Sequence, residues 1–167
     1  MKLVQDRTKA DFIFEAAGLE DTEMLAAYLA RKSAAGTVIA LDGDLGAGKT
    51  AFSQLFAKHL QVQDTVNSPT FTLIKEYEGR LRLNHMDVYR LSLEEADELG
   101  LDEYFYGEGV SLVEWASLIE EILPPEVLEI YIEARSGTAR KFYLSGHGQP
   151  YEAWVHGLRE NGVLLHE

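Results

Sequence analysis

The stretch Gly43-Asp44-Leu45-Gly46-Ala47-Gly48-Lys49-Thr50 decides the fold class, because it fills every fixed position of the pattern G-x-x-x-x-G-K-[ST]. A short apolar run at 37–41 precedes it, as is typical of a buried parallel strand. Residues 50–60 follow with apolar side chains at helical spacing. A strand, a glycine-rich turn and a helix in this order predict a phosphate-binding loop.

The residue types in this loop suit a magnesium-bound nucleoside triphosphate. Glycines allow the backbone to curl so that successive N–H groups point at phosphate oxygens, and the helix that follows adds its positive N-terminal end. Lys49 is predicted to reach the β- and γ-phosphates, and the Thr50 hydroxyl to hold Mg²⁺. The alternative is a glycine-rich turn without a ligand, which the flanking strand and helix disfavour.

The rest of the chain alternates strands and helices, which predicts a three-layer α/β fold of the P-loop NTPase type. We expect one domain over residues 1–167, with a mixed, partly parallel sheet and antiparallel hairpin additions. Asp21 or Thr22 is expected to cap the first long helix, and Ser92 with Glu95 forms a capping box for a later one. Strands are expected at 12–14, 37–41, 71–77, 81–85, 110–114, 127–133 and 141–144.

The composition is acidic, with 28 acidic residues against 15 basic ones and a formal net charge of −13. Such a surface repels phosphodiester backbones, which disfavours a large, direct nucleic-acid interface. The acidity either maintains solubility or complements a basic partner. The chain has no cysteine, no long apolar run and no apolar leader, so we expect a cytoplasmic protein without a membrane segment.

Two acidic residues are candidates for completing a magnesium site. Glu114 ends the apolar run 110–113, and Asp87 follows the strand expected at 81–85. A phosphate-binding loop requires a carboxylate at the end of a neighbouring strand, although either residue could be an ordinary loop carboxylate. Thr70 could sense the γ-phosphate, or it could serve only the turn chemistry of its neighbours.

Other side chains allow two interpretations each. Trp115 is more often a core residue than a ligand contact. Arg90 and Arg140 are the cations we would place nearest to phosphate, although each could be an ordinary ion-pair partner. His85 could have a role at the site, but a structural hydrogen bond explains a histidine at this position equally well. The guanine-reading motif N-K-x-D is absent, which disfavours a GTPase, and no arginine cluster indicates a small-molecule kinase.

Five stretches together carry a specific resemblance. They are Gly43–Thr50, Ser68-Pro69-Thr70-Phe71-Thr72-Leu73, His85-Met86-Asp87-Val88-Tyr89-Arg90-Leu91, Gly100-Leu101-Asp102-Glu103-Tyr104-Phe105 and Leu112-Val113-Glu114-Trp115. In order and spacing they resemble the TsaE (YjeE-type) ATPases of bacterial tRNA threonylcarbamoyladenosine biosynthesis. One departure is Ala116-Ser117, because the family often has proline after the tryptophan.

The resemblance implies a small ATPase that acts with the TsaD and TsaB proteins. That assembly attaches a threonylcarbamoyl group to the adenosine next to the tRNA anticodon, and ATP hydrolysis is thought to reset the complex between turnovers. The tRNA would be held mainly by the partners. The resemblance also places Trp115 near the nucleotide.

Carried over by position, the resemblance assigns roles to five residues. Lys49 and Thr50 bind phosphate and Mg²⁺, and Glu114 is the second metal ligand. Asp87 and Thr70 respond to or assist γ-phosphate cleavage. Hydrolysis would follow in-line attack of water, which Asp87 orients. No arginine finger can be assigned, so we expect weak activity without a partner.

Two other functions stay open from the sequence. One is a phosphotransferase acting on a small metabolite or nucleoside, and the other is a non-catalytic binding module in which ATP only sets a conformation. Phosphate release without an acceptor separates the first from an ATPase, and single-turnover hydrolysis with the partner separates the second.

Overall fold

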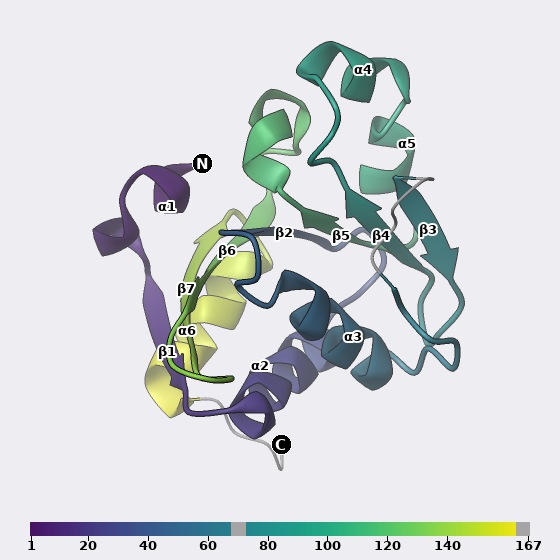
Figure 1. The fold of residues 1–167 in the computed structure, drawn as a ribbon. Coiled ribbons are helices and arrows are strands. Elements are labelled where there is room, and N and C mark those ends of the chain that lie inside the picture. The colour runs from purple at the N-terminus through teal and green to yellow at the C-terminus, as the bar shows by residue number, and fades with distance from the viewer. Residues whose placement is uncertain (68–72, 163–167) are drawn as a thin grey trace.

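The computed structural model describes residues 1–67 and 73–162, and this part of the chain forms a single seven-stranded sheet. The strands lie in the order β1-β7-β6-β2-β5-β4-β3 (Figure 1). Their bounds are β1 Phe12–Ala16, β2 Val38–Gly43, β3 Ile74–Tyr77, β4 Leu83–Asp87, β5 Val110–Glu114, β6 Val127–Ala134 and β7 Arg140–His147.

The centre of the sheet is parallel and its two margins are antiparallel. Strand β2 runs parallel to both β5 and β6, and β4 runs parallel to β5. Strand β3 pairs antiparallel with β4 at one margin, and β6, β7 and β1 are antiparallel at the other. The predicted mixed sheet with hairpin additions is confirmed, and the carboxyl ends of β2, β4 and β5 share one edge.

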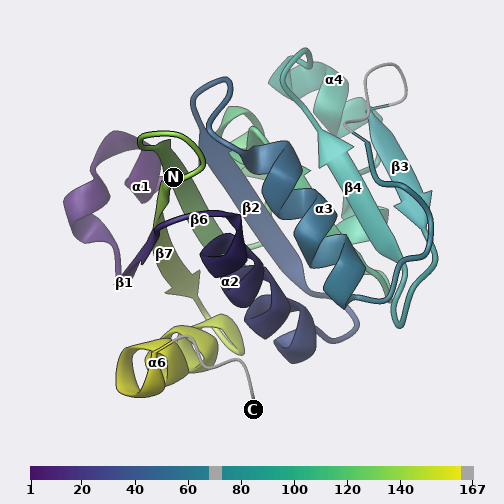
Figure 2. The same ribbon diagram turned by 60° about the horizontal axis from the view of Figure 1, so that its bottom comes forward.

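Helices cover both faces of the sheet, so the three predicted layers are present. Figure 2 shows α2 and α3 side by side across one face, which α6 also covers. The N-terminal segment, η2, α4 and α5 cover the other face. The helical bounds are α1 Lys2–Gln5, η1 Arg7–Lys9, α2 Leu19–Lys32, α3 Lys49–His59, α4 Leu93–Glu98, α5 Asp102–Phe105, η2 Ala116–Ile122 and α6 Tyr151–Asn161. None of the helices in the described ranges has the length and apolar character that crossing a membrane requires.

Two predicted helix caps had different outcomes. The capping box of α4 is confirmed, because the Ser92 hydroxyl accepts from the Glu95 N–H and the Glu95 carboxylate accepts from the Ser92 N–H. The predicted cap of α2 is wrong, because that helix begins at Leu19, ahead of both Asp21 and Thr22. The Asp21 carboxylate instead accepts from the Ala17 N–H, before the helix.

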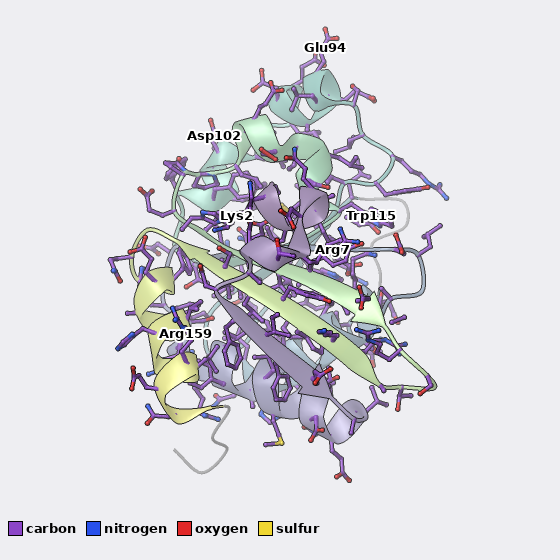
Figure 3. The ribbon with its side chains drawn as sticks, turned by 90° about the vertical axis from the view of Figure 1, so that its left-hand side faces the viewer. Lys2, Arg7, Glu94, Asp102, Trp115 and Arg159 are labelled. Carbon is purple, nitrogen blue, oxygen red and sulfur yellow. The ribbon has the colours of Figure 1, made fainter. Side chains whose placement is uncertain are left out.

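Strand β6 is buried on both faces from Val127 to Ile132, although its sequence alternates. Glu129 is only 1% exposed, and its carboxylate accepts from the Leu3 N–H at 2.8 Å. The Arg7 guanidinium lies 4.2 Å from the centre of the Tyr131 ring. The N-terminal segment, where Figure 3 labels Lys2 and Arg7, therefore supplies the cover for this face.

Candidate functional site

The glycine-rich loop leaves β2 at Gly43 and enters α3 at Lys49. Gly43 and Gly48 have φ angles of +150° and +107°, in the range that L side chains rarely adopt. A Cβ atom at Gly43 would lie 2.5 Å from the carbonyl oxygen of Ile132 on β6. The tight path of the loop therefore depends on glycine at both positions.

Lys49 is held at the mouth of this loop. Its ammonium donates to the Gly43 carbonyl at 2.7 Å and to the Asp44 carbonyl at 3.0 Å. It also lies 3.9 Å from the centre of the Trp115 ring, a cation–π contact. Burial lowers the pKa of Lys49, and nearby carboxylates, Glu114 foremost, oppose that change.

A pocket of about 280 Å³ opens beside the loop and brings together residues from three elements. Its lining residues are Leu45, Gly46, Gly48, Lys49, Thr50, Ala51, Asp87, Glu114 and Trp115. Asp87 and Glu114 are register partners at the ends of neighbouring parallel strands. The sequence predicted that Lys49, Thr50 and these two carboxylates would meet, and the structure places all four on this pocket.

The possible metal ligands on this pocket are few. The described residues contain no group of three or more histidine, cysteine, aspartate or glutamate side chains that could hold a metal ion by themselves. Thr50 and Glu114 offer one hydroxyl and one carboxylate. That donor set fits Mg²⁺, which usually keeps several waters and binds through one or two carboxylates together with substrate phosphates.

The Glu114 carboxylate is held in place from behind the pocket. Its Oε2 lies 2.5 Å from Nε2 of His85 and accepts from the Ser53 hydroxyl at 3.2 Å. All three side chains are buried, with Glu114 2% exposed and the other two fully covered. His85 therefore acts as a structural hydrogen-bond partner of Glu114, one of the two interpretations open from the sequence.

Trp115 is partly buried, and it both packs against the core and lines the pocket. Its backbone is left-handed, with φ of 64°. Its ring lies 4.6 Å from that of Tyr89, measured between centroids. A contact between Trp115 and a bound nucleotide stays a prediction.

The two arginines that we placed near phosphate have different surroundings. The Arg140 Nε donates to the Ala47 carbonyl at 2.6 Å, and its Nη1 donates to the carbonyls of Gly137 and Ala139. Arg140 thus supports the loop from outside, and it is not among the residues that line the pocket. Arg90 is exposed. A contact of Arg140 with nucleotide stays a prediction.

Thr70, the predicted γ-phosphate sensor, lies outside the described residues.

Comparison with known proteins identifies the family. The family model described as "Threonylcarbamoyl adenosine biosynthesis protein TsaE" matches residues 16–142. The chain belongs to the TsaE family. The matched range includes the loop, Asp87, Glu114, Trp115 and Arg140.

Individual relatives agree with the family assignment. The chain is 52% identical over 134 residues to "tRNA threonylcarbamoyladenosine biosynthesis protein TsaE" of Bacillus subtilis (strain 168), covering 80% of this chain and 84% of that one. The Treponema pallidum (strain Nichols) protein of the same name is 43% identical over 112 residues, covering 66% and 83%. The solved structure "Crystal structure of Bacillus subtilus YdiB" superposes with a TM-score of 0.74 at 43% identity, covering 89% of this chain and 94% of that one.

In this TsaE-family chain, sequence reasoning missed one acidic residue close to the loop. Asp42 immediately precedes Gly43 and is 2% exposed. Its Oδ1 accepts from both the N–H and the hydroxyl of Ser117. Burial raises the pKa of Asp42 to about 6. A carboxylate at the end of an otherwise apolar strand was the available signal, but nothing in the sequence pointed to Ser117 as its partner.

Proposed function

We propose that this chain is a magnesium-dependent ATPase that acts in tRNA threonylcarbamoyladenosine biosynthesis on a complex of TsaB and TsaD, in the cytoplasm. One observation carries the proposal. A loop with the triphosphate-binding pattern, two strand-end carboxylates and Trp115 surround one pocket in a TsaE-family chain.

The arrangement suggests how a triphosphate is bound. The Lys49 ammonium donates to two loop carbonyls and can transfer those hydrogen bonds to β- and γ-phosphate oxygens. The N-terminal amides of α3 and the loop amides would donate to the same oxygens. Thr50 and Glu114 would hold Mg²⁺, which when bound neutralises charge that develops on the phosphates.

The hydrolytic step requires a water placed in line with the γ-phosphorus. We assign this water to Asp87, because it is the other carboxylate on the pocket and Glu114 is assigned to Mg²⁺; Oδ1 of Asp87 also accepts from the Tyr89 N–H at 3.0 Å. No arginine lines the pocket among the described residues. An arginine finger can raise the rate of phosphoryl transfer by about 10³–10⁵. We therefore expect slow ATP hydrolysis by the chain alone and faster hydrolysis with a partner.

The charge distribution favours protein partners over direct contact with tRNA. Residues 91–134 contain 13 of the 28 acidic residues and none of the 15 basic ones. On α4 and α5 all six acidic side chains are exposed: Glu94, Glu95, Asp97, Glu98, Asp102 and Glu103. Figure 3 shows Glu94 and Asp102 at one end of the molecule, far from Arg159 on α6. This end repels phosphodiesters and suits a basic protein surface.

The decisive experiment measures phosphate release from ATP without any acceptor, with and without TsaB–TsaD, at several magnesium concentrations. The proposal predicts slow release that the complex accelerates. Glu114→Ala should raise the magnesium requirement by about tenfold or more, because the cation loses a protein ligand. Glu121→Ala, which removes an exposed carboxylate from η2, is the matched control.

Each rival function predicts a different result. Phosphate transfer only when a small-molecule acceptor is added would indicate a phosphotransferase. Tight Mg·ATP binding with no cleavage in a single turnover, even with the complex, would indicate an ATP-gated binding module. Wild-type magnesium dependence in Glu114→Ala would refute the metal assignment.

A further inference from the structure

The turn that carries Trp115 is tied to strand β2 at two consecutive residues. The Trp115 N–H donates to the Leu41 carbonyl at 2.9 Å. The next residue of β2, Asp42, accepts from the Ser117 N–H at 3.1 Å and from the Ser117 hydroxyl at 2.7 Å. The turn is therefore fixed on both sides of Ala116.

Trp115 needs such fixing because its backbone is unfavourable. Its φ and ψ are 64° and 34°, the left-handed region that a bulky residue rarely adopts. Conformations of this kind persist only where the surrounding structure holds them. The Ser117 hydrogen bonds to Asp42 supply that restraint two residues after Trp115.

The restraint matters for the pocket because of what the Trp115 ring touches. Its centroid lies 3.9 Å from the Lys49 ammonium and 4.6 Å from the Tyr89 ring centroid. A rotation of the turn would remove the ring from beneath the ammonium and change the direction in which Lys49 presents its protons. We propose that Asp42 is a positioning residue of the nucleotide site, acting through Ser117 and Trp115 on Lys49.

The chemistry of Asp42 argues against a purely structural role. Its side chain is nearly fully buried and its second oxygen, Oδ2, has no hydrogen-bond partner among the described residues. Burial of an incompletely bonded carboxylate destabilises a fold. An apolar residue at this position would avoid that destabilisation, but it could not accept a hydrogen bond from Ser117. The acceptor oxygen is therefore the property that the site uses, and this inference rests on the proposed function.

The test compares variants that keep or remove that acceptor. Asp42→Asn retains Oδ1, Asp42→Leu removes it, and Ser117→Ala removes the shorter of the two hydrogen bonds. Ser145→Ala is the matched control. Ser145 lies on β7, and its hydroxyl also donates to a carboxylate, that of Asp11, at 2.8 Å.

All variants are made in a Trp154→Phe background, which leaves Trp115 as the single tryptophan. The emission maximum and acrylamide quenching of Trp115 report its environment without ATP, and calorimetry gives the Kd for Mg·ATP. Asp42→Leu is expected to weaken Mg·ATP binding by about tenfold, roughly 1.4 kcal/mol, and to increase quenching. Asp42→Asn should stay within about twofold of the background in both measurements, and Ser117→Ala should fall between them.

The outcomes separate this inference from the proposed function. Folded Asp42→Leu with unchanged Kd and quenching overturns the inference. If Asp42→Leu does not fold, unchanged quenching in Ser117→Ala overturns it instead. A wild-type protein that binds no Mg·ATP refutes the proposed function, and Trp115 quenching then still decides whether Asp42 fixes the turn. If Ser145→Ala changed the Trp115 quenching and the Kd for Mg·ATP as much as Ser117→Ala does, the inference would also be overturned.

Discussion

Replacing Asp42 with asparagine should change how the stability of the protein depends on pH. Burial raises the pKa of this carboxyl from 3.8 to about 6, Glu129 reinforces the rise, and the Ser117 donors and Lys49 oppose it. Between these two pH values the folded protein keeps a proton that the unfolded chain has released. The free energy of unfolding therefore falls as the pH rises through this window.

The size of the effect follows from the two pKa values. At ~1.36 kcal/mol per pK unit, the rise to about 6 corresponds to about 3 kcal/mol in total, of which about 2 kcal/mol falls between pH 4.5 and 7. Asp42→Asn cannot ionise, so its stability relative to wild type should increase by that amount over the same range. The sign is the informative part, because a carboxylate held in a favourable ion pair would give the opposite trend.

Urea denaturation followed by circular dichroism, at half-unit intervals from pH 4.5 to 7, measures this difference. Asp64→Asn, which removes an exposed carboxylate, controls for the loss of one surface charge. Parallel stability profiles for wild type and Asp42→Asn would refute the reasoning, since Asp42 would then ionise equally in the folded and unfolded chains.

Three further predictions concern the loop and the core. Lys49→Ala should abolish measurable Mg·ATP binding in calorimetry, because the phosphates lose their buried cation, while the melting temperature shows that the fold persists. Gly48→Ala should also weaken binding, since φ is +107° and the new Cβ would lie 3.0 Å from Nε of Arg140; wild-type affinity would contradict this. Phe52→Ala should lower the free energy of unfolding by about 3–5 kcal/mol, because its fully buried ring packs against both Phe56 and Phe142, and denaturant titration gives the value.

The local parts of the site could be predicted from the sequence. The loop follows from a short motif whose flanking strand and helix lie within a few residues of it. Asp87 and Glu114 could be placed together because both end strands of a parallel sheet, and such ends meet at one edge. In each case the information lies in one segment or in a general rule of topology.

The remaining parts depend on contacts between distant segments. Glu129 lies in an alternating run, and nothing in that run indicates that the N-terminal segment covers it. Asp42 and Ser117 are 75 residues apart, and Ser53 and Glu114 are 61 apart. Periodicity and capping rules describe neighbours along the chain, so they carry no information about these pairs.

The β6–β7 hairpin holds the glycine-rich loop from the side. The carbonyl of Ile132 on β6 occupies the space where Gly43 would carry a side chain, and Arg140 on β7 binds the Ala47 carbonyl. Insertions in the short connection 135–139 would shift both supports at once. A mutational scan that selects for nucleotide binding should therefore find sensitive positions in this hairpin, about ninety residues downstream of the motif, even where the side chains never touch the ligand.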